Sequence, residues 1–376
     1  MPGKTKLTSV IALAACLALG PAAESVATRY PLDGNGMWIW YVSQSGGSAS
    51  AIADQAQSHN FRTVLIKSSD GGSAWSQFTP QLVDRLHDRG LRVCAWQFVY
   101  GARPRAEAQR GAEAVAKGAD CLVIDAESAY EGRYRAADRY LRGLRARIGH
   151  SYPLALAGFP YVDFHLTFPY SVLLGRGGAT MNAPQAYWRT IGTTVPTALA
   201  HTYTWNRPYD RRIFPLGQTY QDPPDDELRA FRRRSAGYNA RGVSWWSWQE
   251  TGGHEWDVIG HRIHGPYPDP PNDFPTLSEG ARGDLVLWIQ QLLRAAGERV
   301  GVDGTFGSGT IQAVRRFQGD HGLAQSGIVG DATWRKLDDF RAARINWSQR
   351  GNPGFTKAMQ ARIAPPFEVP STPGRP

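Results

Sequence analysis

Between residues 30 and 262, short apolar runs alternate eight times with helix-like segments, and this alternation limits the chain to a few folds. It predicts a parallel sheet, because a helical crossover brings the chain back to start each new strand in the same direction. Eight such repeats in about 230 residues are typical of a closed (β/α)8 barrel of the TIM type. The predicted strands are Met37–Val42, Thr63–Lys67, Arg92–Phe98, Cys121–Asp125, Pro153–Ala157, Met181–Tyr187, Ile213–Thr219 and Val243–Trp248.

The segments between these runs carry helix boundary signals. Thr79-Pro80 predicts a helix start, and Gly90 and Gly118 predict helix ends. An open, doubly wound sheet is the alternative fold, and it usually has a glycine-rich phosphate-binding turn after its first strand. Here that turn reads SQSGGS over residues 43–48, without the G-x-G-x-x-G spacing. The barrel is therefore favoured over the open sheet.

A second pattern fills residues 277–340, after a proline-rich linker at residues 263–276. Apolar residues at helical spacing and intervening glycine turns predict a small all-α module of three helices. The order VDGTFG…T…AV..FQ…GL…GIVG..TW..L, from Val302 to Leu337, closely resembles the peptidoglycan-binding domain type 1 of bacterial wall enzymes. The resemblance implies an anchor that raises the local concentration of wall substrate. We expect the C-terminal extension at residues 341–376 to be partly disordered, in its proline-rich tail from Ala364.

The chain is basic, with a formal net charge of +9. It carries no motif that reads RNA or DNA, so we expect peptidoglycan or another anionic cell-wall glycan as its partner and no nucleic acid. Residues 1–27 are similar to an export signal, with an apolar run followed by small residues. Within them, LAAC resembles a lipobox that would leave a lipid on Cys16. We expect a location outside the cell or in its envelope, with membrane contact only through the signal peptide or that lipid.

Two further cysteines, Cys94 and Cys121, lie in predicted neighbouring strands. A disulfide requires that they sit at the same depth along the two strands; otherwise both are small buried hydrophobes. Neither begins a helix beside a basic partner, so we expect no catalytic cysteine.

The fourth predicted strand ends in LVIDAE, where the active sites of such barrels lie. Asp125 and Glu127 are two residues apart, so both side chains should point into the barrel mouth. Two carboxylates this close do not both ionise easily, so the pair should keep a proton that can be given to a glycosidic oxygen. The alternative is a structural hydrogen-bonding pair at the barrel rim.

This D-x-E resembles family-25 glycoside hydrolases, the lysozyme-like muramidases, and more distantly the family-18 chitinases. The resemblance implies that Glu127 is the proton donor and that Asp125 orients the N-acetyl group of the sugar. Family-25 enzymes usually have an aspartate at the end of the first strand, and this chain has none there. Asp33 and Asp70 are the nearest acids that could substitute for it.

Other strand ends predict a saccharide cleft, because aromatic faces stack on sugar rings while amides and carboxylates bind hydroxyls. Glu250 is also a second candidate acid or nucleophile. The candidate substrate-binding residues are Gln185, Tyr187, Gln218, Trp246, Trp248, Glu250, Asp70 and Trp96, and Phe159 and Tyr161 could add to them.

The sequence lacks the motifs of the other enzyme classes that act on cell walls. The histidines have no metallopeptidase spacing and there is no G-x-S-x-G, so we expect no metal and no cofactor. The predicted function is a secreted glycoside hydrolase acting on peptidoglycan or a related N-acetylated amino-sugar polymer. The alternative is a non-catalytic wall-binding protein on a degenerate barrel. For such an enzyme with a wall anchor, deleting residues 277–376 should weaken wall retention while sparing cleavage of small soluble fragments.

Overall fold

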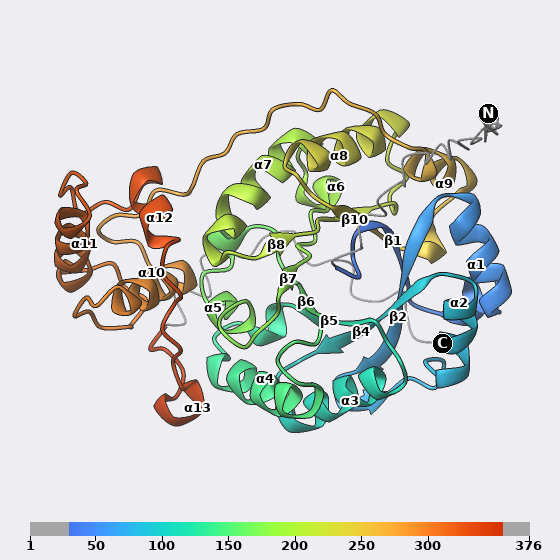
Figure 1. Cartoon of the computed structure of the whole chain (residues 1–376), viewed down its shortest axis with the longest axis horizontal. Coiled ribbons are helices and arrows are strands. Elements are labelled where there is room, and N and C mark those ends of the chain that lie inside the picture. Colours follow the sequence, from blue (N-terminus) through green and yellow to red (C-terminus); the bar gives the residue numbers. More distant parts are fainter. Residues whose placement is uncertain (1–29, 356–376) are drawn as a thin grey trace, which may run out of the picture.

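Parallel strands curl into a barrel surrounded by helices in the computed structural model, which describes residues 30–355 (Figure 1). The predicted (β/α)8 barrel is confirmed. A short β3 (Ser73–Ala74) pairs antiparallel with the end of the second strand. The barrel strands are β1 (Gly34–Ile39), β2 (Phe61–Asp70), β4 (Arg92–Val99), β5 (Cys121–Ala126), β6 (Leu154–Ala157), β7 (Met181–Asn182), β8 (Arg212–Ile213), β9 (Leu216–Gln218) and β10 (Gly242–Trp246).

β8 and β9 are two pieces of the seventh strand, separated by Phe214-Pro215, where proline has no N–H for a ladder bond. β8 pairs with β7 and β9 pairs with β10, and a bridge between Gln185 and Leu216 continues the closure. The sixth and eighth strands are shorter than predicted. β7 covers two residues before Pro184, and β10 ends at Trp246, after which the chain enters a 3-10 turn.

Helices cover the outside of the barrel. Thr79 caps α2 by accepting a hydrogen bond from Leu82 N, so the predicted start at Thr79-Pro80 is confirmed. The α-helices are α1 (Ala49–Ser58), α2 (Pro80–Asp88), α3 (Pro104–Ala116), α4 (Tyr134–Ile148), α5 (Tyr170–Leu173), α6 (Trp188–Ile191), α7 (Val195–Asn206), α8 (Asp225–Gly237) and α9 (Gly253–Gly260). The 3-10 helices are η1 (Val42–Gln44), η2 (Ser128–Tyr130), η3 (Val162–Phe164), η4 (Arg207–Tyr209) and η5 (Trp248–Glu250).

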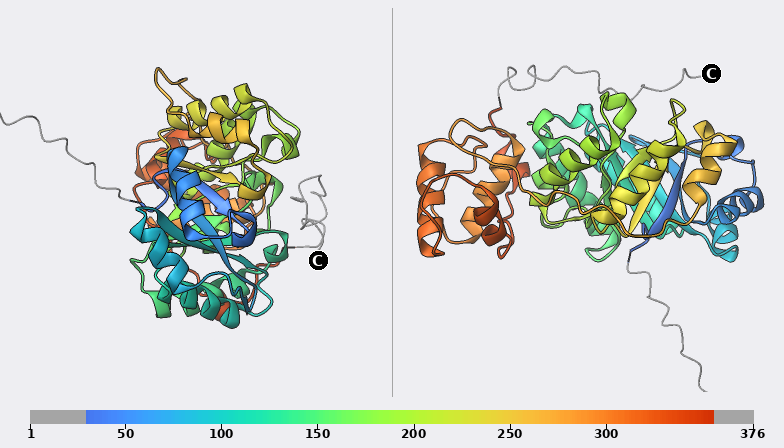
Figure 2. Two further views of the ribbon diagram at one scale, coloured as in Figure 1. Left: turned by 90° about the vertical axis from the view of Figure 1, so that its right-hand side faces the viewer. Right: turned by 90° about the horizontal axis from the view of Figure 1, so that it is seen from above.

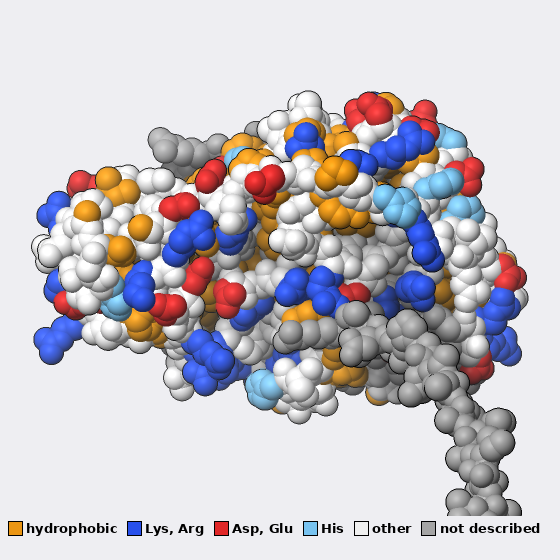
Figure 3. Space-filling view, turned by 45° about the horizontal axis from the view of Figure 1, so that its top comes forward, with side chains coloured by type: hydrophobic (Ala, Val, Ile, Leu, Met, Phe, Trp, Pro, Cys, Tyr) orange, Lys and Arg blue, Asp and Glu red, His pale blue; other side chains and the backbone are white. Residues whose placement is uncertain are grey.

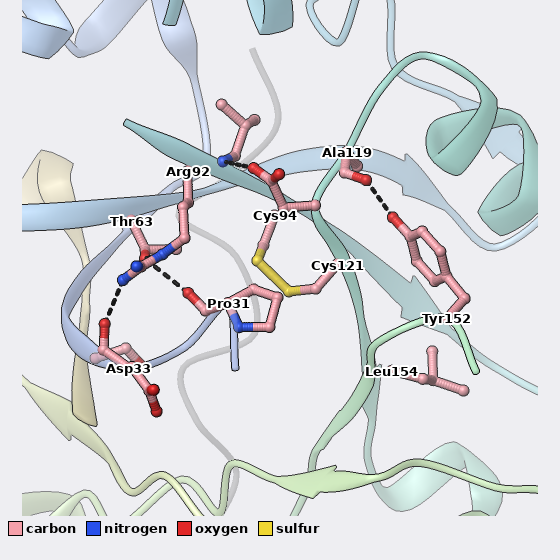
Figure 4. Close-up of a disulfide and its surroundings, with 12 residues drawn as sticks. Pro31, Asp33, Thr63, Arg92, Cys94, Ala119, Cys121, Tyr152 and Leu154 are labelled. Carbon is pink, nitrogen blue, oxygen red and sulfur yellow. Dashed lines mark hydrogen bonds between the residues drawn. A yellow bond between two sulfur atoms is a disulfide. The ribbon is translucent and has the colours of Figure 1, made fainter. Parts of the chain in front are cut away.

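A disulfide joins Cys94 and Cys121 inside the barrel (Figure 4). The two residues are register partners in β4 and β5, and both are fully buried. They therefore sit at the same depth, which the sequence left open. Nearby, Arg92 donates hydrogen bonds to Thr63 Oγ1 and to the backbone carbonyl of Asp33. This network ties together the starts of β1, β2 and β4, at the end of the barrel opposite the mouth.

The C-terminal module is helical, as predicted, and lies beside the barrel (Figure 2). Two antiparallel bridges, Leu277 with Val329 and Arg282 with Thr305, fasten its loops. The linker crosses the outside of the barrel in extended form before it reaches the module (Figure 1). The helices of this part are α10 (Asp284–Ala295), α11 (Ser308–Asp320), α12 (Asp331–Leu337) and α13 (Trp347–Arg350).

The described part of the C-terminal extension is ordered, because α13 packs against α4 and the rings of Trp347 and Tyr134 lie 5.2 Å apart. The predicted export signal with Cys16, and the tail from residue 356, lie outside the described residues. Among residues 30–355, no helix has the length and apolar content that a membrane crossing requires.

Candidate functional site

Asp125 and Glu127 lie together at the C-terminal end of β5, in the barrel mouth. The Gln185 amide binds both of them: its Nε2 donates to Asp125 Oδ1 at 3.0 Å and to Glu127 Oε1 at 3.2 Å. Asp125 is buried and Glu127 is half-buried, so Glu127 is the more accessible of the two. The structure therefore brings together three of the residues selected from the sequence, from two distant segments of the chain.

Asp125 resists ionisation. Burial raises the pKa of its carboxyl well above the usual range, the charge of Glu127 raises it further, and the Lys67 ammonium opposes both effects. Such a raised pKa favours retention of a proton by the pair.

Replacing Asp125 with asparagine should reduce the loss of stability between about pH 4 and about pH 8. A carboxyl whose pKa is raised by folding favours the folded state at low pH, and this contribution is lost as the pH rises through the raised pKa. An amide does not ionise. Over this range the free energy of unfolding of the wild type should therefore fall, relative to that of the variant, by about 1.4 kcal/mol for each unit by which folding raises the pKa of Asp125. Urea unfolding at the two pH values measures this difference. An equal pH dependence in the two proteins would contradict it.

Lys67 is a site residue that the sequence analysis missed. It ends an apolar run within β2, and its Nζ lies 2.8 Å from Asp70 Oδ2. Tyr100 donates a hydrogen bond to the other oxygen of Asp70 at 2.9 Å. The ammonium also lies 4.5 to 4.8 Å from the ring centres of Trp40, Trp75 and Trp96. A single buried lysine inside an apolar strand is the signal that could have identified it.

Asp70 reaches the mouth as predicted. β2, β4 and β5 are in register there, with Asp70 opposite Phe98 and Phe98 opposite Asp125. Asp33 does not, because it precedes β1 at the other end of the barrel, where it forms an ion pair with Arg241. Asp33 therefore cannot substitute for a first-strand aspartate.

Trp96 forms the floor of the mouth and not an open platform. It is 1% exposed, and its indole N–H donates to the Ile39 carbonyl at 3.0 Å. Trp38 and Trp246 each lie 5.5 Å from it, and Trp246 is the half-buried member that reaches the mouth. Stacking of a sugar on Trp96, one of the predicted contacts, is therefore blocked by its neighbours.

Two other predicted contacts are placed differently from expectation. Gln218 has no exposed surface: its amide accepts from Arg189 N and donates to the Tyr220 carbonyl, which fixes the loops. Trp248 lies beyond the end of β10 and packs on Trp256 of α9, with ring centres 4.8 Å apart. The period-two pattern that placed Trp248 beside Trp246 fails because the strand has already ended there.

Tyr187 and Glu250 lie at the mouth as expected. Tyr187 is buried against Tyr220 in an edge-to-face contact at 5.5 Å. Burial raises the pKa of its phenol, and the neighbouring Tyr220 and the charges of Asp125, Glu127 and Glu250 add to this, so the hydroxyl stays protonated. Glu250 is exposed, at the rim.

A narrow cleft, with a free volume of about 20 Å³, lies beside Gln185, between the loops that follow β6 and β7. Three of its lining residues are aromatic, and His165 on its wall is held by Glu131, with Nδ1 and Oε1 3.0 Å apart. Its lining residues are Phe159, Pro160, Tyr161, His165, Gln185, Tyr187, Thr190 and Ile191. Phe159 and Tyr161 were expected to contribute here.

A second, larger depression, of about 650 Å³, lies over the loops after β1 and β2. The rings of Tyr41 and Trp75 on its wall lie 5.3 Å apart, and Trp75 contacts Lys67. Its remaining lining residues are Val42, Ser43, Gly47, Ala74, Ser76, Gln77 and Leu82. Gln185, which binds the carboxylate pair, lines the narrow cleft, and Trp75, which contacts Lys67, lines the larger depression.

One group of described side chains has the geometry to hold a metal ion. Ligand atoms of Asp222, on the loop after β9, and of His254 and Glu255, in the first turn of α9, lie within 4.8 Å of one another. Glu255 is already used as a helix cap, because it accepts the Gly252 N–H, and the other two residues are exposed. The proposed chemistry at Asp125 and Glu127 does not draw on this group.

Charge is spread over the surface. On the face shown in Figure 3, Lys and Arg side chains are interspersed with Asp and Glu over both the barrel and the module. Among the described residues on this face there is no continuous basic surface of the kind that binds nucleic acid.

Comparison with known proteins identifies the C-terminal module. Residues 282–337 match the family described as "Putative peptidoglycan binding domain", so the predicted peptidoglycan-binding domain is confirmed. A zinc D-Ala-D-Ala carboxypeptidase of Streptomyces albus G is 45% identical over 67 residues, which are 16% of this chain and 26% of that protein. The N-acetylmuramoyl-L-alanine amidase CwlL of Bacillus licheniformis is 37% identical over 78 residues, 20% of this chain and 22% of its own. The chain thus spans about a quarter of the length of these two relatives.

Solved structures similar to the larger part of the chain are more distant. A class V chitinase of Pseudomonas fluorescens Pf-5 covers 60% of this chain and 98% of its own at 10% identity, with a TM-score of 0.45. The Bacillus cereus spore cortex-lytic enzyme SleL covers 60% of this chain and 73% of its own at 11% identity, with a TM-score of 0.44. Structural similarity this weak is no evidence for an activity. The specific resemblance to family 25 is not confirmed.

Proposed function

We propose that the chain is a glycoside hydrolase that cleaves peptidoglycan or a related N-acetylated amino-sugar polymer of the cell wall. The single observation that carries the proposal is the Gln185 amide, which binds Asp125 and Glu127 together in the open end of the barrel. A carboxylate pair that retains a proton beside an aromatic cleft is the arrangement that protonation of a glycosidic oxygen requires. The confirmed wall-binding module supports the choice of substrate.

The proposed roles follow from accessibility. Glu127, which is half-buried, gives its proton to the glycosidic oxygen as the bond to the sugar C1 breaks. Asp125, which is buried behind it, orients the N-acetyl group, whose carbonyl oxygen attacks C1. Water then opens this cyclic intermediate and returns a proton to Glu127. Gln185 keeps the two carboxylates in place throughout.

The two depressions support a polymeric substrate. Tyr41 and Trp75 on one side offer half-buried rings to a sugar, and Tyr187 and Phe159, which are 3% and 8% exposed, line the narrow cleft on the other. Lys67, neutralised by Asp70 and enclosed by tryptophans, is a positioning residue between them.

Export is part of the same proposal. The Cys94–Cys121 disulfide is typical of proteins that work in an oxidising compartment outside the cytosol. A cell-envelope or extracellular location also agrees with the wall-binding module.

Incubation of the wild-type protein with purified peptidoglycan tests the proposal directly. We expect new reducing ends in the soluble fraction, with sugar termini that mass spectrometry can assign. The matched measurement is sedimentation of the protein with the same wall preparation. If the protein sediments with the wall preparation but releases no reducing sugar from peptidoglycan or chitin, the protein is a non-catalytic wall-binding protein and the hydrolase proposal is wrong.

A further inference from the structure

The wall-binding module is fastened to the barrel through one buried carboxylate, Asp284, at the start of α10. Its oxygens accept hydrogen bonds from Tyr134 OH at 2.7 Å, Ser171 Oγ at 2.6 Å, Ser171 N at 2.7 Å and Tyr209 OH at 2.8 Å. All of these donors belong to the barrel. Trp288, one turn further along α10, donates to the Pro208 carbonyl.

Asp284 is 1% exposed, so the interface is dry at this point. Burial raises the pKa of its carboxyl to about 6, and hydrogen bonds from Ser171, Tyr134 and Tyr209 oppose that increase. At neutral pH the ionised carboxylate is therefore stabilised by the hydrogen-bond donors of the barrel, because an isolated buried charge would be strongly unfavourable. This is a specific contact and not a flexible tether.

The same contact reaches the wall of the cleft. The backbone N–H of Asp284 donates to the Leu166 carbonyl at 2.7 Å. The preceding Gly283, at φ +112°, has no room for a side chain, since a Cβ there would lie 2.7 Å from that carbonyl oxygen. Leu166 follows His165 directly, and His165 lines the cleft beside Gln185.

We define residues 159–171 as the cleft loop. Its two ends are connected through Tyr170, whose hydroxyl donates to the Phe159 carbonyl at 3.0 Å. On the barrel side, the loop is held by Glu131, which binds His165 and Thr167. On the module side it is held by Asp284, which binds Leu166 and Ser171.

We propose that the wall-binding module is a structural part of the saccharide cleft, and that Asp284 is the positioning residue that orders the cleft loop from outside the barrel. The cleft's role in saccharide binding rests on the proposed function. The ordering of the loop does not. The module then anchors the protein and also completes its cleft. Deleting residues 277–376 should therefore weaken binding of small soluble fragments as well as wall retention, in contrast to the expectation for a simple tether.

Amide hydrogen exchange of the full-length chain tests the proposal. We expect Asp284→Ala to speed exchange in residues 159–171 by about 10-fold or more, while exchange in β4 and β5 and within α10–α12 stays unchanged, because local order is lost without global unfolding. Asp320→Ala, an exposed acid on the same module, is the matched control and should leave exchange as in the wild type. Unchanged exchange in the cleft loop of Asp284→Ala overturns the proposal.

Two further variants approach the same contact if Asp284→Ala does not fold. Tyr209→Phe removes one hydrogen-bond donor from the barrel side, and Gly283→Ala forces the module away from Leu166. Both variants should speed hydrogen exchange in residues 159–171 relative to Asp320→Ala. Unchanged exchange in either variant overturns the proposal.

Binding of a tetramer of N-acetylglucosamine, followed by tryptophan fluorescence, gives the functional readout. We expect Asp284→Ala to bind it about 5- to 10-fold more weakly than the wild type. Equal affinity in the two proteins overturns the link to the cleft. If the wild type cleaves no glycan yet the loop loosens in Asp284→Ala, the hydrolase proposal fails while the ordering role of Asp284 stands.

Discussion

Replacing Glu127 with glutamine should lower the rate of reducing-sugar release from purified peptidoglycan by about 100- to 10,000-fold. Glutamine has the same size and can still accept the hydrogen bond from Gln185, but it has no proton to give to the glycosidic oxygen. The loss should be in kcat, because the proton transfer belongs to the transition state, while KM stays close to the wild-type value. Time courses at saturating and limiting substrate measure the two constants.

Glu113→Gln is the matched control for this variant. Glu113 is on the outer surface of α3, where it pairs with Arg110, so the same chemical change is made far from the mouth. The control should retain wild-type rates, and both variants should sediment with peptidoglycan as the wild type does. A Glu127→Gln protein that releases sugar at the wild-type rate would show that Glu127 is not the acid, and would direct attention to Glu250 at the rim.

Removing the disulfide should have the largest effect on stability. Replacing Cys94 and Cys121 with alanine should lower the free energy of unfolding by about 2–4 kcal/mol. The bond closes a loop between residues 27 apart in sequence, which restricts the unfolded chain, and both side chains are fully buried inside the barrel. Chemical denaturation of the wild type and the double variant under oxidising conditions measures the difference.

A reductant provides the internal control for the disulfide prediction. Reduced wild type should lose about as much stability as the double variant, whereas the double variant should not respond to the reductant. Equal midpoints for the oxidised and reduced wild type would contradict the predicted contribution of the disulfide.

Much of the architecture follows from short-range patterns. Each of the eight apolar runs overlaps a strand, since burial on both faces of a parallel strand leaves a continuous apolar signal. The cap at Thr79 and the helices of the module were equally evident, because capping and helical periodicity involve residues a few positions apart. The proximity of Asp125 and Glu127 has the same origin, since the repeat of a strand is two residues.

Strand ends were the weak point of this reasoning. Trp248 and Gln218 were assigned to the mouth by extending the period-two pattern, but β10 stops at Trp246 and the Gln218 amide bonds to loop backbone. Where a strand ends depends on the loops that pack against it. Asp33 was placed wrongly for a related reason. It is close to β1 in sequence, but this closeness does not show at which end of the barrel it lies and pairs with Arg241.

By itself, the sequence determined the barrel, the wall-binding module and the carboxylate pair, because repeat, periodicity and motif are properties of neighbouring residues. Only the tertiary structure decided what surrounds that pair and how the two parts of the chain meet. Gln185 reaches Asp125 across 60 positions, and Tyr134 reaches Asp284 across 150. Such contacts depend on how helices and strands pack in three dimensions, and no local pattern encodes them.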